Sequence, residues 1–281
     1  MALMEATTTL HATSTVPHEV VHEVAHEGGI HVALAAEKLG EWMGLPITNT
    51  LVTSWVAVAI LVSLAFLVGR NPKLIPGKLQ LLLEDIVSYI KDFVSETLEN
   101  EKVARRFLPL LITIFLFIAV SNLLEFVPGV GSIGFFGDHG FSSLFRSVNT
   151  DLNFTLALAI ISVVAIEIAG IATLGFFRYG GKFINFHGHG IGEKLLNFVV
   201  GIIELVSEVS RLVSFSFRLF GNIFAGEVLL AVAVFFAPYF IPVPLMAFEM
   251  FVGVVQGAVF ALLTLFFIKL AITDAHANEA H

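Results

Sequence analysis

The chain has 281 residues, of which 57% are hydrophobic and 14% are charged, and its mean hydropathy is +0.90. Soluble domains carry about 25% charged residues, so this chain has too few charges to cover a water-exposed surface. The absence of cysteine excludes thiol catalysis and cysteine-bound metals, and the net charge of −8 argues against a nucleic-acid partner. Composition and charge therefore predict an integral membrane protein.

The first 49 residues form a polar segment rich in histidine and glutamate, without an apolar run long enough to cross a bilayer. The membrane domain is expected at residues 50–275, and its first span at residues 50–68. Residues 77–102 predict an amphipathic helix. Its apolar residues recur at helical spacing and form one stripe: Leu79, Leu82, Leu83, Ile86, Ile90 and Phe93. We expect this helix to lie along the membrane surface.

Four further apolar segments follow at 107–126, 152–177, 192–236 and 245–272, before a short polar tail at 276–281. As one helix, residues 192–236 would extend about 67 Å, more than twice the ~30 Å hydrocarbon core of a bilayer. This segment must therefore break, for instance near Gly221-Asn222, or cross at a steep tilt. The predicted fold is an all-α integral membrane protein with about five membrane-embedded helices and one surface helix.

The distribution of lysine and arginine predicts the orientation of the chain. With the N-terminus outside, the cytoplasmic side receives eleven basic residues and the outer side only Lys38 and Arg146. Cytoplasmic segments of membrane proteins carry such an excess, so we expect the C-terminus in the cytoplasm. The remaining two basic residues, Arg211 and Arg218, fall within the membrane.

Ionisable residues inside the predicted spans are the candidates for function, because each costs about 2.5–3.5 kcal/mol to insert. Arg218 has apolar sequence on both sides. Steps of four and three residues back from Arg218 stay on one helical face, and they reach Ser214, Arg211, Ser207 and Glu204. Asn222 continues this polar stripe one turn beyond Arg218. The stripe predicts a polar path from the cytoplasmic end to Arg218.

A second set of polar residues lies further outward and on another face. Glu227 follows Arg218 by nine residues, which places it about 180° around the helix. Glu249 and Gln256 share a face of the last helix. Two offset paths that meet at a fixed cation suggest access channels for a carried proton or sodium ion, whereas a pore would show one continuous stripe. Arginine suits the barrier because it stays protonated at any accessible pH.

The run RLFGNIFAGE at residues 218–227 resembles the signature of subunit a of rotary F-type ATP synthase. Asp151 within TDLNFT, together with Glu249 and Gln256, agrees with this resemblance, which covers about residues 50–275. It implies that Arg218 faces the membrane carboxylate of each c-subunit as the c-ring turns, and that Gln256 lies beside Arg218. It also implies that the two long helices lie steeply tilted against the ring.

The resemblance further implies two aqueous half-channels. The outer one would be lined by Asp151, Asn222, Glu227 and Glu249, and the inner one would be bordered by Glu204, Ser207, Arg211 and Ser214. Arg218 would prevent leakage between them, so that ion flow drives ring rotation and ATP synthesis, with no catalysis and no cofactor in the chain itself. The implied partners are the c-ring, the b-subunit of the peripheral stalk, the lipid bilayer and the transported H⁺ or Na⁺. The implied location is the bacterial plasma (inner) membrane.

Two alternatives belong to other functional classes. An ion-coupled secondary transporter is disfavoured because the sequence shows no internal repeat. His18 and His22 match the HExxH motif of zinc proteases, but they lie in a charged segment, for which a solvated tail is the favoured interpretation.

Three further acids have less defined roles. Glu125 is near the end of a span and is expected at the membrane interface, and Glu208 is expected to face cytoplasmic water. For Glu167, in the middle of a span, a structural hydrogen-bond or ion partner is as well supported as a channel role.

Overall fold

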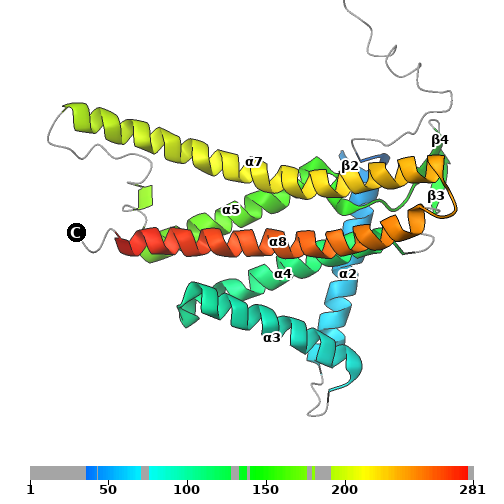
Figure 1. Cartoon of the computed structure of the whole chain (residues 1–281), viewed down its shortest axis with the longest axis horizontal. Coiled ribbons are helices and arrows are strands. Elements are labelled where there is room, and N and C mark those ends of the chain that lie inside the picture. Colours follow the sequence, from blue (N-terminus) through cyan, green and yellow to red (C-terminus); the bar gives the residue numbers. More distant parts are fainter. Residues whose placement is uncertain are drawn as a thin grey trace, which may run out of the picture. The chain divides into compact units, whose positions relative to one another are not determined.

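A computed structural model describes residues 36–42, 44–70, 76–127, 133–137, 140–175, 179–180 and 191–277, all of which belong to the unit Ala33–His281. This part of the chain contains six long helices, labelled in Figure 1: α2 (Asn49–Gly69), α3 (Lys78–Leu98), α4 (Glu101–Glu125), α5 (Leu152–Leu174), α7 (Ile191–Phe236) and α8 (Pro242–Ala277). All except α3 are long and apolar enough to cross a membrane. The described residues therefore confirm an all-α membrane fold with five spanning helices.

Two short β-hairpins accompany the helices. Strand β1 (Lys38–Trp42) pairs antiparallel with β2 (Leu45–Thr48), and β3 (Gly134–Gly137) pairs antiparallel with β4 (Gly140–Ser143). In the first turn Gly44 has φ +81°, a conformation that glycine adopts at little steric cost. The first hairpin leads directly into α2, because the Thr48 side chain caps the helix by accepting a hydrogen bond from the Leu51 N–H. The sequence pattern did not anticipate this hairpin within residues 1–49.

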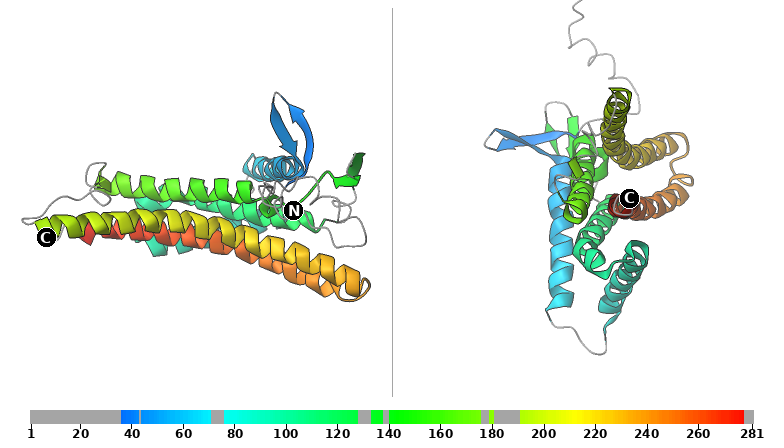
Figure 2. Two further views of the ribbon diagram at one scale, coloured as in Figure 1. Left: turned by 90° about the horizontal axis from the view of Figure 1, so that it is seen from above. Right: turned by 90° about the vertical axis from the view of Figure 1, so that its left-hand side faces the viewer.

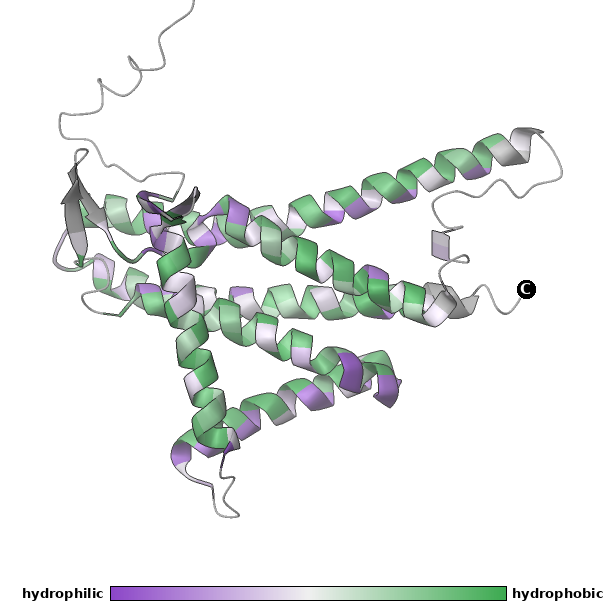
Figure 3. Ribbon diagram, turned by 180° about the vertical axis from the view of Figure 1, so that it is seen from behind, coloured by the Kyte–Doolittle hydropathy of each residue, from purple (hydrophilic) through white to green (hydrophobic). Residues whose placement is uncertain are grey.

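The amphipathic helix expected over residues 77–102 ends earlier, at Leu98. Glu99 follows in the left-handed conformation with φ 54°, and the Asn100 side chain then accepts hydrogen bonds from the N–H groups of Lys102 and Val103. Asparagine is among the preferred N-cap residues, so residues 101 and 102 begin α4 instead. Figure 3 shows hydrophilic residues along α3, alternating with hydrophobic ones, whereas the spanning helices are mostly hydrophobic.

Helix α7 is continuous over 46 residues and does not break at Gly221-Asn222. At ~1.5 Å per residue it is about 69 Å long. Helix α8, with 36 residues, packs against the C-terminal part of α7, and the two helices diverge toward the N-terminal end of α7 (Figures 1 and 2). The 21-residue α2 has the length of an upright span and runs across α7 and α8 in both figures. Helices α7 and α8 are both much longer than the ~30 Å hydrocarbon core of a bilayer. They therefore fit within a bilayer only when they are steeply tilted.

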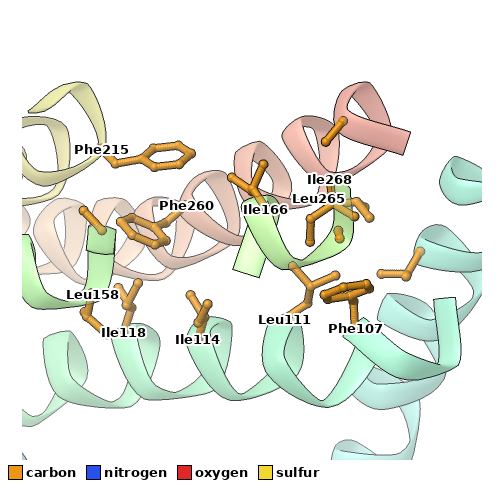
Figure 4. Close-up of a cluster of buried hydrophobic side chains, with 14 of the residues drawn as sticks. Phe107, Leu111, Ile114, Ile118, Leu158, Ile166, Phe215, Phe260, Leu265 and Ile268 are labelled. Carbon is orange, nitrogen blue, oxygen red and sulfur yellow. The ribbon is translucent and has the colours of Figure 1, made fainter. Parts of the chain in front are cut away.

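The apolar core lies between α4, α5, α7 and α8. Figure 4 shows side chains from all four helices meeting in one layer, among them Ile118, Leu158, Phe215 and Phe260. The rings of Phe215 and Phe260 have centroids 5.2 Å apart. Helices α4 and α8 approach closely at Gly257, where a Cβ atom would lie 3.2 Å from a backbone oxygen of α4. This packing holds α7 and α8 in register and positions the polar residues described next.

Candidate functional site

Arg218 lies near the middle of α7, on the exposed side of the helix. Its guanidinium is 3.4 Å from the Ser214 hydroxyl, one turn earlier. Within the described residues no carboxylate forms an ion pair with it. Phe217 beside it is also exposed, and large apolar side chains cover this flank of α7. A permanent cation on an apolar, membrane-embedded surface is costly, so Arg218 requires either solvation by water or an anionic partner from another chain.

Asn222 continues the exposed face that carries Ser214 and Arg218, as the helical spacing predicts. Its side-chain N–H donates to the Gln256 Oε1 at 2.7 Å, and Gln256 itself is buried within α8. This bond links α7 to α8 one turn beyond Arg218. The structure therefore brings Gln256 close to the Arg218 face, with Asn222 as its direct partner.

A small acidic pocket lies between α4, α7 and α8. It is lined by Asn122, Glu125, Phe126, Ile223, Gly226, Glu227, Leu230 and Glu249. The carboxylate of Glu249 occupies the position where a Cβ atom on Gly226 would lie, so a larger residue at position 226 would push this carboxylate aside. The structure thus brings Glu227 and Glu249 together, as the sequence suggested, and it adds Glu125, which had been expected at the interface.

The Glu227 carboxylate pairs with Arg146, whose guanidinium nitrogen lies 3.1 Å from the Glu227 Oε2. The two side chains are only 10% and 27% exposed. Arg146 comes from the segment that precedes the 3₁₀ turn η2 (Val148–Thr150), more than 80 residues earlier in the chain. The position of Arg146 between two spans predicted only a basic residue in an outer loop. Nothing in the sequence pattern indicated its ion pair with Glu227.

Asn122 holds the wall of the acidic pocket together. Its Nδ2 donates to the backbone oxygen of Gly253 in α8 at 2.9 Å, and its Oδ1 accepts from Asn149 Nδ2 at 2.6 Å. A Cβ on Gly253 would lie 2.8 Å from the Asn122 side chain. Both asparagines are fully buried, where an unsatisfied amide costs several kcal/mol. This network fixes α4, η2 and α8 around the carboxylates, and no sequence periodicity could have identified it.

Asp151 occupies a different position. Its carboxylate caps α5 by accepting from the Asn153 N–H at 3.0 Å and also accepts from the Thr50 hydroxyl at 3.1 Å. It thereby joins the start of α2 to the start of α5. Asp151 is not among the residues that line the acidic pocket.

The residues predicted to border the inner path, in the N-terminal part of α7, separate into two groups. Ser207 and Ser214 are exposed on the Arg218 side, and Glu204 is half-buried. Arg211 turns toward α8 instead. Its guanidinium pairs with Glu208 at 2.8 Å and stacks 4.2 Å from the Phe267 ring centroid.

We call Glu208, Arg211 and Phe267 the Arg211 cluster. Glu208 is buried, whereas the sequence placed it toward cytoplasmic water. The i,i+3 spacing of an acid and a base on one helix was the sequence signal that could have predicted this ion pair.

Tyr179 lies near this cluster and is buried against Gly170 of α5. Burial, together with the adjacent Glu167 carboxylate, raises the pKa of the Tyr179 hydroxyl above its usual range.

The HExxH residues His18 and His22 lie outside the described residues. Within the residues that the structure does describe, no group of three or more histidine, aspartate or glutamate side chains is arranged to hold a metal ion.

Comparison with known proteins identifies the family of the chain. The family model "ATP synthase A chain" matches residues 51–269. The chain is 35% identical to ATP synthase subunit a of Mycobacterium bovis over 240 residues, which cover 82% of this chain and 89% of the relative. It is 33% identical to the subunit a of Propionigenium modestum described as sodium ion specific, over 238 residues covering 84% and 78% of the two chains.

A third relative, ATP synthase subunit a 3 of Pelobacter propionicus, is 33% identical over 224 residues, which cover 79% of this chain and 87% of the relative. The match spans all five membrane helices and includes Arg218, Glu227, Glu249 and Gln256 within its limits. The chain therefore belongs to the ATP synthase subunit a family, the multi-pass inner-membrane stator subunit of the Fo motor.

Proposed function

We propose that this chain provides two offset aqueous half-channels that carry protons to and from the carboxylates of a c-ring, with Arg218 as the barrier between them. The observation that carries the proposal is the position of Arg218. Its side chain is exposed on the surface of α7 and has no carboxylate partner among the described residues. An arginine that passing carboxylates can pair with neutralises each in turn but cannot relay a proton itself.

The positions of the acidic residues support two half-channels that are offset from each other. Glu227 and Glu249 lie in the acidic pocket, between α7 and its neighbours, whereas Arg218 lies on the exposed face of α7. Among the residues that the structure describes, no continuous line of side-chain acids leads from this pocket to the other half of α7. Glu227, Glu249, Asn222 and Asp151 therefore line or shape the outer path, and Glu204, Ser207, Arg211 and Ser214 border the inner one. Gln256 holds Asn222 next to Arg218.

The chain itself performs no covalent catalysis in this proposal, and its partners are the c-ring, the b-subunit of the peripheral stalk and the lipid bilayer. The eleven basic residues assigned to one side support an orientation with the N-terminus outside and the C-terminus in the cytoplasm. Each proton that crosses the membrane releases ~2.3 kcal/mol per 100 mV. Because Arg218 blocks direct passage, this energy is released only by turning the ring.

The test is Arg218→Ala in the assembled ATP synthase, studied in inverted membrane vesicles. ATP-driven proton pumping should be abolished, while ATP hydrolysis by the soluble head persists. Arg106→Ala is the matched control, since Arg106 is exposed at the start of α4 and lies away from the site. Normal pumping by the Arg218 variant would contradict the proposal. Loss of solute uptake with pumping intact would indicate a secondary transporter instead.

A further inference from the structure

Arg211 is a second permanent cation in the apolar part of α7, seven residues before Arg218. Seven residues make almost two full turns, so the two arginines start from the same face of the helix, about 10 Å apart along its axis. Arg218 is exposed on that face, and so is Ser214 between them. The Arg211 side chain, by contrast, is only 11% exposed. The fold therefore withdraws one of two equally spaced cations from this face.

Two contacts hold Arg211 in the withdrawn position. Its Nη1 donates to the Glu208 Oε2 at 2.8 Å, and its guanidinium carbon lies 4.2 Å from the centroid of the Phe267 ring in α8. Both partners are fixed in turn. The Glu208 side chain is only 10% exposed, and the Phe267 ring packs edge-on against Phe215, with centroids 5.6 Å apart. An ion pair and a cation–π contact are strongest where water is excluded, as it is here.

The segment after α5 closes the Arg211 cluster on another side. Gly175 has φ +82° at the end of α5, and the Tyr179 ring lies directly over Gly170, in the space that a Cβ atom there would occupy. Tyr179 is buried and lies close enough to Glu208 and Arg211 to interact with both charges. Groups from three parts of the chain therefore surround Arg211, which separates it from a surface arginine that merely folds back along its own helix.

We propose that Glu208 and Phe267 are positioning residues that keep the Arg211 cation off the ring-facing side of α7. Of the two arginines, only Arg218 then meets a passing carboxylate. The proposal rests on the half-channel function proposed above and deepens it. A second guanidinium on the exposed face, about 10 Å before Arg218, would pair with the same carboxylates and hold them short of Arg218. Withdrawal of Arg211 removes this competing site from the inner path.

The first test releases Arg211 by combining Glu208→Gln with Phe267→Leu in the assembled complex. ATP-driven pumping in inverted membrane vesicles should fall about two- to fivefold, the factor by which an exposed ion pair prolongs the stay of a carboxylate. The matched control makes the same two substitutions at exposed positions, Glu84→Gln on α3 and Phe266→Leu on α8. Equal pumping by the release variant and this control would overturn the proposal.

The second test separates the released charge from damaged packing. Addition of Arg211→Gln to the release variant removes the cation that has been set free, so pumping should rise above that of the release variant. A defect of packing or assembly would persist or deepen, because the third substitution removes one more buried side chain. Absence of any recovery would show that Glu208 and Phe267 act through packing alone and would also overturn the proposal.

The third test places a cation on the exposed face while the Arg211 cluster stays intact. Ser207 is exposed there, one turn before Arg211. Ser207→Lys should pump about two- to fivefold less than Ser207→Gln, which adds an uncharged side chain of similar length. Equal pumping by the two variants would mean that a second cation on this face is harmless and would overturn the proposal. Normal pumping by Arg218→Ala would instead remove the half-channel function itself.

Discussion

The acidic pocket and the Arg211 cluster are both built on α7, but their charges are balanced in different ways. In the Arg211 cluster the acid and the base are three residues apart on the same helix, and they form an ion pair with each other. In the acidic pocket the base comes from a distant segment and faces three acids. A local, balanced pair suits a structural role, whereas an excess of buried acids requires protons and so suits transport.

The largest effect is expected from Arg146→Ala. Removal of one partner of a buried ion pair costs about 3–5 kcal/mol, and here it leaves three glutamates without a cation. Because these acids become neutral when protonated, the loss of stability should be smaller at acidic pH than at neutral pH. Thermal unfolding of the purified complex at several pH values measures this. Arg105→Ala, whose pair with Glu101 is exposed, should show no comparable change.

A smaller effect is expected from Gly226→Ala. The new methyl group would occupy the position of the Glu249 carboxylate, and such overpacking costs about 1–3 kcal/mol. Proton pumping should fall together with stability, because the Glu249 carboxylate must turn away from its place against Gly226. Gly192→Ala on the same helix is the matched control, since nothing lies within 4 Å of its added Cβ. Equal pumping by the two variants would mean that the pocket tolerates a displaced Glu249.

The smallest effect is expected from Glu208→Ala in the Arg211 cluster. We expect a loss of about 1–2 kcal/mol, because Arg211 keeps its stacking on Phe267 and can extend its long side chain toward water. The pH profile of pumping should not move. The double variant with Phe267→Leu should lose more stability than the sum of the single variants. A pumping defect as large as that of Arg218→Ala would make the two regions functionally alike and break the comparison.

Helical spacing predicted the Arg218 face well because it depends only on local geometry. Residues three and four apart share a face whatever the rest of the chain does, and Ser214, Arg218 and Asn222 are indeed exposed together. Arg211 has the same spacing but leaves this face. Its long side chain reaches Glu208 and the ring of Phe267, and a contact with α8 cannot be seen in the periodicity of α7.

The acidic pocket was predicted only in part, because contacts between different helices do not appear in the periodicity of any one helix. Glu227 and Glu249 were recognised as costly acids inside apolar spans. Glu125 was assigned to the interface because it lies at a helix end, and Arg146 to an outer loop because it lies between spans. Both assignments used position along the chain, whereas the pocket is formed by segments that are far apart in it.

The sequence by itself determined that this is a membrane protein, where its helices lie, and that an arginine, Arg218, lies within an apolar span. Composition and local periodicity contain that information, because insertion into a bilayer depends on the apolar length of each segment. Only the tertiary structure decided which acids meet, that α7 remains unbroken, and that Arg146 pairs with Glu227. Charge balance in a buried site depends on distances between helices, and these distances are set by packing at contacts such as Gly226–Glu249 and Asn122–Gly253.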